Sequence, residues 1–315
     1  MYGCYDNRMN PPLILASRRF TVGLMPDLGG ALLYFGTLRG PLVEFVRPTS
    51  ARTLAERNVR GTAGYPMVPY SNRIADGRFR FQGRDVALAT NSDVSTHPLH
   101  GLGWLHAWEV VEASPERAVL ALSHVPTGAA DAEWPWSFEA RQTFELDDQR
   151  LSWHIALTNH DAQPMPAGFG MHPFFPKTPR TELRFAAAGV WRNDERMLPM
   201  SRTEVPAEWD FGTPRPIADL AVDNCFAGWS HTADIVWPEI GWGLALAAPE
   251  RFGHLVVYTS PARDSIAVEP ITHVNNAVNL AADHADTGLV VLAPGATLDG
   301  GFTLTPYPLE KPDAR

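Results

Sequence analysis

Four residues of types suited to proton transfer lie in four separate short motifs. They are His100 in HPLHGLGW, His172 in GFGMHPFFP, Asp223 in AVDNCFAGW and Glu269 in SIAVEPITHVNN. The flanking segments mix aromatic residues, Gly and Pro, which is typical of strand ends and turns. Two imidazoles and two carboxylates can supply an acid and a base near neutral pH, and nearby rings such as Phe174 and Trp229 offer flat apolar faces. The combination indicates a sugar site.

Each motif also has an ordinary structural interpretation. His172 precedes a proline that holds it extended, so a fixed general acid and a satisfied core histidine both remain open. Glu269 ends an apolar run. If that run is a buried strand, burial raises the pKa of the carboxyl and makes it a functional candidate. Taken alone, Asp223 fits an Asx-turn, and Arg73 in YSNRIADGRF fits a surface arginine.

His97 and His100 stand three residues apart, which raises the question of a metal site. A strand places such residues on opposite faces, and Pro98 and Gly101 break a helix. Because no HExxH motif occurs elsewhere, no metal site is predicted. His97 is expected to be a buried structural histidine, with its part in a site left open. His100 is the better candidate, since the next residue is a glycine, which lets a ligand approach the backbone. The remaining histidines are expected at the surface or in turns.

Composition excludes several classes of function. The 315 residues carry 26 basic and 35 acidic side chains, a net charge of −9, which argues against nucleic acid or an anionic membrane as a partner. The only lysines are Lys177 and Lys311, and no Gly-rich phosphate loop occurs, so neither a Schiff-base enzyme nor a P-loop enzyme is expected. Cys4 and Cys225 are too few for a disulfide framework or a zinc-finger set. No cofactor is predicted.

Nothing in the chain predicts export or membrane insertion. Its start, MYGCYDNRMNPP, lacks a basic stretch followed by an apolar run, so no signal peptide is expected. No run of about 18 apolar residues occurs, so no membrane-spanning helix is expected either. A soluble cytoplasmic protein is the resulting prediction.

Apolar and polar residues alternate along most of the chain. SFEARQTFEL and LSWHIALTN, joined by DDQR, predict an antiparallel hairpin. RFRFQGRDVAL predicts a second hairpin turning near Gln82-Gly83, and HAWEVVEAS with RAVLALSHV a third. One more strand pair is expected within LVVLAPGATLDGGFTLTPY, and only SARTLAERN and HVNNAVNLAADH have helical spacing. Many short strands without a linker or composition shift predict one β-sandwich domain over residues 1–315.

Taken in order, the motifs resemble those of the aldose 1-epimerase (galactose mutarotase-like) family. The matching features are NRI, HG, a His followed by Pro-Phe-Phe, DN.F, and a Glu at a strand end near the C-terminus, from about Gly29 to Thr305. Three segments depart from the forms that are common in the family. HGLGWLHAW replaces HGG…GF, EPITHVNN replaces ETQ, and DNCFAGW replaces DH.F. These departures bear on the choice of substrate more than on the chemistry, because the ionisable residues persist.

The resemblance implies a large antiparallel β-sandwich and a role for each matching residue. Glu269 corresponds to the general base, His172 to the general acid, and His100 to a second histidine that helps polarise the ring oxygen of a sugar. Asp223, Arg73 and its neighbour Asn72 correspond to substrate-binding residues, while Phe174 and Trp229 can pack on the C–H face of the sugar. The site residues are therefore expected to converge, with Glu269 within about 10 Å of His172, close enough for one bound sugar to reach both.

The implied activity is interconversion of the α and β anomers of a free aldohexose. A monosaccharide is then the partner, and the protein is expected to be a monomer or a weak homodimer. A sugar-phosphate 1-epimerase on the same scaffold needs a cationic cluster at the rim, for which Arg73, Arg78 and Arg80 are candidates. A non-catalytic carbohydrate-binding protein would keep the aromatic residues and Asp223 but tolerate loss of Glu269. A polysaccharide hydrolase or lyase usually carries further domains, for which this chain has no room.

Overall fold

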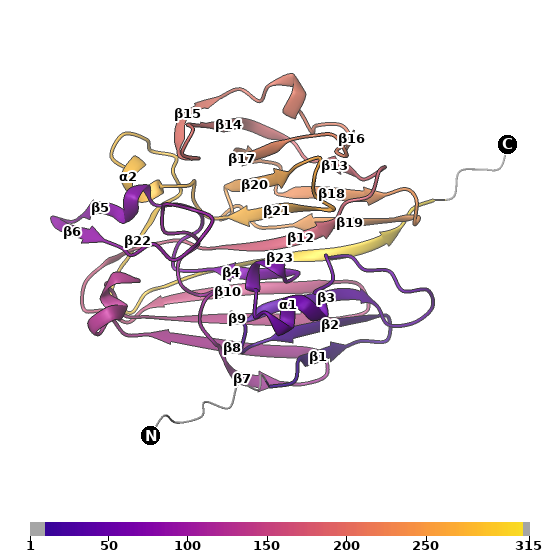
Figure 1. The fold of residues 1–315 in the computed structure, drawn as a ribbon, viewed down its shortest axis with the longest axis horizontal. Helices are drawn as coiled ribbons and strands as arrows, with labels where there is room; N and C mark the ends of the chain where they lie inside the picture. Colours follow the sequence, from indigo (N-terminus) through magenta and orange to yellow (C-terminus); the bar gives the residue numbers. More distant parts are fainter. Residues whose placement is uncertain (1–9, 311–315) are drawn as a thin grey trace.

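The computed structural model describes residues 10–310, so Cys4 and most of the N-terminal segment considered above lie outside the described residues. Two large antiparallel sheets form a β-sandwich, which confirms the predicted fold (Figure 1). The first sheet has ten strands, in the order β1 (Leu13–Ala16), β2 (Phe20–Met25), β3 (Ala31–Thr37), β4 (Gly64–Met67), β12 (Gly170–Pro176), β21 (Ser265–Ile271), β20 (His254–Thr259), β17 (Val222–Trp229), β14 (Ala187–Asn193) and β15 (Pro199–Thr203).

The second sheet has nine strands. Their order is β16 (Arg215–Pro216), β13 (Glu182–Arg184), β18 (Thr232–Trp237), β19 (Trp242–Ala247), β23 (Thr297–Pro308), β10 (Leu151–Asn159), β9 (Phe138–Leu146), β8 (Arg117–His124) and β7 (Glu109–Ala113). Two small two-stranded sheets pair β5 (Arg78–Phe81) with β6 (Arg84–Ala87) and β11 (Met165–Ala167) with β22 (Val290–Leu292).

Helical segments are few and short, as the sequence predicts. The α-helices are α1 (Ala51–Ala55) and α2 (Ala277–Leu280), and the 3₁₀ turns are η1 (Val59–Gly61), η2 (Ala75–Gly77), η3 (Gly128–Ala132) and η4 (Ala207–Trp209). Among the residues 10–310, no helix has the length and apolar character needed to cross a membrane. At one side of the molecule α2 lies beside the β5–β6 hairpin, where the Asn279 amide donates to the Arg78 carbonyl (Figure 1).

The three predicted hairpins are confirmed. β9 pairs with β10, β7 with β8, and β5 with β6, and the last pair turns at Gln82 and Gly83. The expected pairing within the C-terminal segment is wrong. β22 pairs with β11, whereas β23 inserts between β10 and β19. The long β23 has an apolar residue at every second position that must enter the core, and two neighbouring strands satisfy both of its backbone edges.

Alternating side chains of the ten-stranded sheet separate into two environments. On β21, Ile266 and Val268 face the core between the two sheets, whereas Ala267, Glu269 and Ile271 point to the other face. β12, β20 and β17 follow the same alternation, and this outer face has a smaller apolar cluster of its own. The outer face therefore carries every second residue of the three motifs that lie on β12, β17 and β21.

Candidate active site

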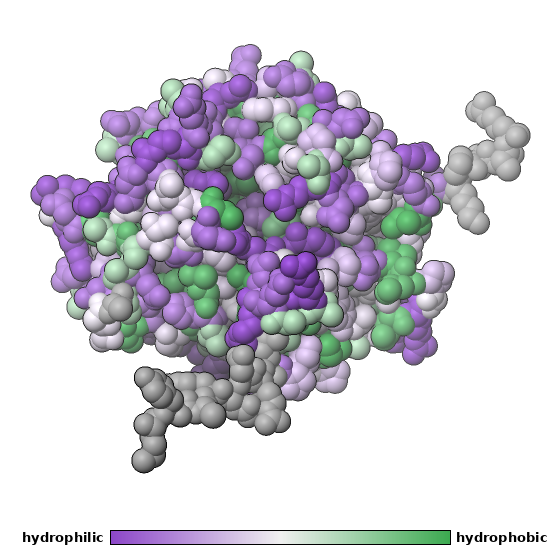
Figure 2. Space-filling view, in the orientation of Figure 1, coloured by the Kyte–Doolittle hydropathy of each residue, from purple (hydrophilic) through white to green (hydrophobic). Residues whose placement is uncertain are grey.

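A cleft of about 470 Å³ opens on the outer face of the ten-stranded sheet. Among its lining residues are all of the predicted site residues except Trp229, namely Asn72, Arg73, His100, His172, Phe174, Asp223 and Glu269. In the space-filling view the molecule is hollowed near the middle of the visible face, and hydrophilic residues border this hollow (Figure 2). The volume lies in the range typical of small-molecule sites.

His172 and Glu269 meet on neighbouring strands at the floor of the cleft. The register of β12 and β21 pairs Gly170 with Ile271 and Phe174 with Ala267, which sets His172 opposite Glu269 on the same face. Nε2 of His172 lies 3.2 Å from Oε1 of Glu269, far inside the expected 10 Å. The side chains are 10% and 3% exposed. The contact therefore joins a potential acid and base in a nearly dry environment.

Burial shifts the pKa values of both partners toward their uncharged forms. Burial raises the pKa of Glu269 well above its ordinary value, and the nearby Asp223 acts in the same direction. Burial also lowers the pKa of His172 to about 3, with a further contribution from the Arg47 guanidinium. One proton shared across the contact therefore resides preferentially on Glu269, and the pair is electrically neutral over a wide range of pH.

His100 is held by a backbone turn that fixes its tautomer. The Asn72 backbone N–H donates to Nδ1 of His100 at 3.1 Å, and the His100 backbone N–H donates to the Asn72 backbone carbonyl at 2.9 Å. Because Nδ1 accepts this bond, the proton of the neutral ring sits on Nε2. The ring centroid lies 5.3 Å from that of His172. Burial and the neighbouring His172 lower the pKa of His100 well below its ordinary value, so it can serve as a neutral hydrogen-bond donor.

Gly101 explains how this turn approaches the sheet so closely. It has a φ of +67°, and a Cβ at this position would lie 2.0 Å from the Val68 carbonyl oxygen. Glycine is required by both the conformation and the contact. The HG motif therefore positions the histidine through its glycine.

Arg73, Asn72 and Asp223 complete the polar lining. The Arg73 guanidinium donates to the Asn72 side-chain oxygen at 3.1 Å. Burial raises the pKa of Asp223, and Arg73 opposes this shift. The Asn193 amide donates to the Asp223 carbonyl at 2.9 Å and fixes the start of β17. These groups supply donors and acceptors that a polyhydroxylated ligand can use.

Of the two predicted aromatic residues, Phe174 lines the cleft and Trp229 does not. Trp229 lies outside the cleft. It is 2% exposed in the core between the sheets, and its indole N–H donates to the Phe252 carbonyl at 2.5 Å. Gly228, with φ +59°, interrupts the extended backbone just before it and turns the ring inward. Phe174 does line the cleft, but its ring stacks on His172 at 4.4 Å and lies 3.8 Å from the Arg47 guanidinium carbon.

Sequence patterns missed several cleft residues. Arg47, Arg60, Tyr65, Tyr258 and Arg263 all line it. Only the two tyrosines had a detectable signal, because both belong to strands whose alternation directs them to the outer face. The three arginines lie in segments outside the strands, where no periodicity assigns a direction. Of the arginines considered for a cationic rim, Arg73 lines the cleft and Arg78 and Arg80 do not.

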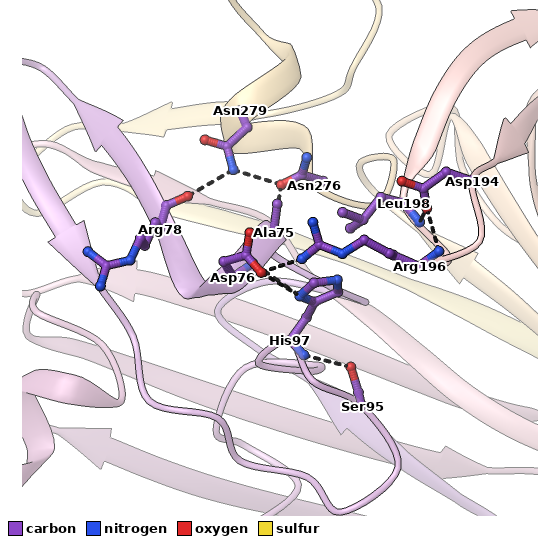
Figure 3. A network of polar contacts seen from close by, with 10 residues as sticks. All are labelled: Ala75, Asp76, Arg78, Ser95, His97, Asp194, Arg196, Leu198, Asn276 and Asn279. Atoms are coloured by element: carbon purple, nitrogen blue, oxygen red, sulfur yellow. Dashed lines mark hydrogen bonds and ion pairs between the residues drawn. The ribbon is translucent and has the colours of Figure 1, made fainter.

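His97 belongs to a polar network beside the cleft (Figure 3). It is 1% exposed, as expected for a structural histidine, and its Nδ1 accepts the Asp76 backbone N–H at 3.1 Å. The Asp76 carboxylate also pairs with Arg196, which comes from the β14–β15 connection. Asn276 accepts from the Ala75 N–H at 3.0 Å, so the segment after Arg73 is anchored on two sides.

Three of the histidines expected at the surface or in turns are buried. His124, His254 and His273 are 7%, 4% and 3% exposed. His273 uses both ring nitrogens, accepting from the Ser71 N–H at 3.1 Å and contacting the Val274 carbonyl at 2.8 Å. Residues 10–310 contain no group of three or more His, Cys, Asp and Glu side chains arranged to hold a metal ion.

Comparison with known proteins identifies the family of the chain. Residues 19–305 match the model of the aldose 1-epimerase family, and the chain belongs to that family. It is 31% identical over 250 residues to the uncharacterized protein YphB of Escherichia coli K12, covering 76% of this chain and 82% of that protein.

Solved structures show the same fold. A candidate aldose 1-epimerase from Escherichia coli K12 superposes with a TM-score of 0.85 at 26% identity, covering 95% of this chain and 99% of that one. A galactose mutarotase-like protein from Clostridium acetobutylicum gives a TM-score of 0.83 at 17% identity, covering 94% and 95% of the two chains. Family and fold together support an epimerase of the mutarotase type.

Proposed function

We propose that this protein is an aldose 1-epimerase that interconverts the α and β anomers of an aldohexose. Glu269 is the general base, His172 is the general acid, and His100 donates a hydrogen bond from Nε2 to the ring oxygen. The observation that carries the proposal is the 3.2 Å contact between a buried carboxyl and a buried imidazole at the floor of a cleft of about 470 Å³. Acid and base stand together where one pyranose ring can reach both.

Ring opening requires two proton transfers around C1. Glu269 removes the proton from the C1 hydroxyl, and the electrons of that O–H bond form the C1 carbonyl. The bond between C1 and the ring oxygen breaks, and His172 delivers a proton to that oxygen. Rotation about the C1–C2 bond presents the other face of the aldehyde, and the reverse steps close the ring. Protons and electrons balance, and the enzyme ends each cycle unchanged.

The resting pair needs one internal proton transfer to become reactive. Burial favours the proton on Glu269, whereas the chemistry starts with the proton on His172. Transfer across the contact generates the carboxylate and the imidazolium without exchange with solvent. The pair is inactive when both groups are protonated, and also when the shared proton is lost. The lowered pKa of His172 and the raised pKa of Glu269 therefore predict a rate that is constant between these two pKa values and falls on either side of them.

Substrate hydroxyls are bound by the polar lining. Asp223 accepts hydrogen bonds from sugar hydroxyls, and Arg73 and Asn72 donate to them. Phe174 lines the cleft and keeps the His172 ring in place by stacking. These groups bind the substrate and the transition state alike, so they contribute to affinity more than to turnover.

The test is anomer exchange measured by NMR on a panel of aldoses, together with binding by calorimetry. Glu269→Gln keeps the size and shape of the side chain but cannot take the C1 proton, so turnover should fall by about 10²-fold or more while affinity changes little. Glu250→Gln is the matched control, because Glu250 is exposed and does not line the cleft. A Glu269→Gln variant with full turnover would contradict the assignment.

A non-catalytic sugar-binding protein is the competing function. It would bind an aldose by calorimetry without accelerating exchange, and Glu269→Gln would leave that binding unchanged. The buried contact between His172 and Glu269 speaks against it, because two ionisable groups nearly removed from water are costly to maintain for binding alone.

A further inference from the structure

Tyr65 lies beside the reacting pair, although neither proton transfer uses it. Its strand β4 pairs with β12, and the register places Tyr65 directly opposite His172 on the same face of the sheet. The two ring centroids are 4.7 Å apart. His172 in turn lies opposite Glu269 on the next strand. Tyr65, His172 and Glu269 therefore form one row across β4, β12 and β21, with His172 in the middle.

Packing holds the Tyr65 ring in one position. Its centroid lies 5.7 Å from that of Trp104, 6.0 Å from that of His100 and 6.3 Å from that of Phe174. Aromatic rings at such separations attract one another beyond the effect of the area they bury. Tyr65 is 2% exposed. Because its neighbours enclose the ring, the fold sets the position of the hydroxyl before any ligand arrives.

The Tyr65 hydroxyl is available to a ligand in the cleft. It forms no hydrogen bond with another group of residues 10–310, and it is not among the polar atoms of these residues that are shielded from solvent without a partner. It therefore reaches the cleft that Tyr65 lines. Burial raises the pKa of Tyr65 well above its ordinary value, Glu269 acts in the same direction, and Arg47 and Arg60 oppose the shift. The hydroxyl therefore stays neutral and can both donate and accept a hydrogen bond.

The order of the three residues in the row matches the order of the atoms in an aldopyranose. In the reaction proposed above, Glu269 meets the hydroxyl on C1 and His172 meets the ring oxygen. On the other side of the ring oxygen from C1 is C5, which carries C6 in an aldohexose. Tyr65 is one strand farther from Glu269 than His172 is, a step of about 4.8 Å. Its hydroxyl therefore lies on the side of the ring oxygen where C6 and its hydroxyl project.

We propose that Tyr65 selects aldohexoses by forming a hydrogen bond between its hydroxyl and the hydroxyl on C6 of the sugar. The proposal rests on the epimerase function above and specifies which residue chooses the substrate. An aldopentose in its pyranose form lacks C6 and leaves the buried Tyr65 hydroxyl without a partner. Leaving a buried polar group unpaired costs free energy, and this cost is the physical basis of the selection.

Three sugars that differ only at C6 provide the experiment. Glucose has C6 and its hydroxyl, 6-deoxyglucose keeps the carbon but lacks the hydroxyl, and xylose lacks both. In anomer exchange by the wild-type protein, kcat/KM should be about tenfold higher for glucose than for 6-deoxyglucose, as expected for one hydrogen bond in a buried site. Xylose should be no better than 6-deoxyglucose. Equal values for glucose and 6-deoxyglucose would overturn the proposal.

Tyr65→Phe tests the residue assignment, because it removes the hydroxyl and keeps the packed ring. It should lower kcat/KM for glucose by about tenfold, to the value for 6-deoxyglucose. The value for 6-deoxyglucose should stay the same or rise, since this sugar leaves the hydroxyl unpaired. Tyr34→Phe is the matched control, because Tyr34 lies on β3 and does not line the cleft. A loss of the same size for all three sugars in Tyr65→Phe would contradict the assignment to C6.

Calorimetry separates failure of this inference from failure of the epimerase function. If no sugar is exchanged faster than in buffer, the epimerase function fails. Tighter binding of glucose than of 6-deoxyglucose, with the difference lost in Tyr65→Phe, would still support the hydrogen bond to C6. Equal binding of the two sugars by the wild-type protein would refute it.

Discussion

The two faces of the ten-stranded sheet show what burial does to different residue types. On the inner face, Met171, Phe175, Ile266 and Val268 pack against the second sheet and are fully buried. Burial there removes apolar surface from water and stabilises the fold. On the outer face of the same strands, burial of His172 and Glu269 disfavours their charged forms and costs free energy.

On β12 and β21, therefore, the inner face stabilises the fold and the outer face carries the reactive groups. Adjacent residues such as Val268 and Glu269 belong to opposite faces. A substitution of Val268 should therefore change the free energy of unfolding, whereas a substitution of Glu269 should change the reaction rate. The inner face holds the backbone of β12 and β21 in register, and this register sets the distance between His172 and Glu269.

The largest effect is expected from removing both members of the outer-face pair. Glu269→Gln and His172→Asn should each reduce turnover by about 10²-fold or more. The double variant should lose little beyond the more damaged single variant, because the two groups share one proton and act as a unit. Exchange rates of the wild type and all three variants by NMR check this. Losses that multiply would show that the two residues act independently.

A smaller effect, of a different kind, is expected on the inner face. Ile266→Ala should lower the free energy of unfolding by about 2–5 kcal/mol, whereas Ile266→Val should lower it by about 0.5–1.5 kcal/mol. Turnover of the folded fraction should stay within a few-fold of the wild type, because the side chain points away from the cleft. Denaturant titration and exchange NMR measure the two quantities. A large loss of turnover in the folded Ile266→Ala protein would mean that the faces are coupled.

The sequence was sufficient to predict the ionisable centre because the strands impose a simple rule. Alternation places His172 and Glu269 on one face of a sheet, and the Gly after His100 permits the close turn that brings it to them. Trp229 was misplaced because one left-handed residue, Gly228, reverses the direction that alternation predicts. A positive φ inside a strand cannot be inferred from a glycine alone.

Three arginines of the cleft were beyond prediction for a different reason. Arg263 lies far along the chain from Arg47 and Arg60, and the strand order β4-β12-β21-β20 brings these segments to one site. The order of the nine-stranded sheet likewise explains the wrong pairing at the C-terminus, where β23 pairs with β10 and β19, which are distant in sequence. Local patterns specify faces, whereas the order of strands depends on the packing of the whole chain.

Outer-face histidines remote from the cleft should give stability a pH dependence smaller than the loss in Ile266→Ala. Burial lowers the pKa of His254 to about 4, with a further contribution from His273, and burial lowers the pKa of His273 to about 4 as well. The unfolded chain binds these protons near the ordinary value of 6.5, so the stabilisation is fully present above that pH and is lost as pH falls toward 4. Each residue should account for about 2 kcal/mol of lost stability at pH 4.5.

His254→Asn isolates one of these contributions. Both ring nitrogens of His254 are buried without a hydrogen-bond partner in the described structure, so the replacement breaks no bond of the side chain. The difference in unfolding free energy between variant and wild type should therefore move by about 2 kcal/mol in favour of the variant between pH 7 and pH 4.5. Denaturant titrations at the two pH values measure it, with His154→Asn on the exposed side of β10 as the control. If the difference does not change with pH, His254 gains its proton equally well in the folded protein, and burial on the outer face is less complete than on the inner face.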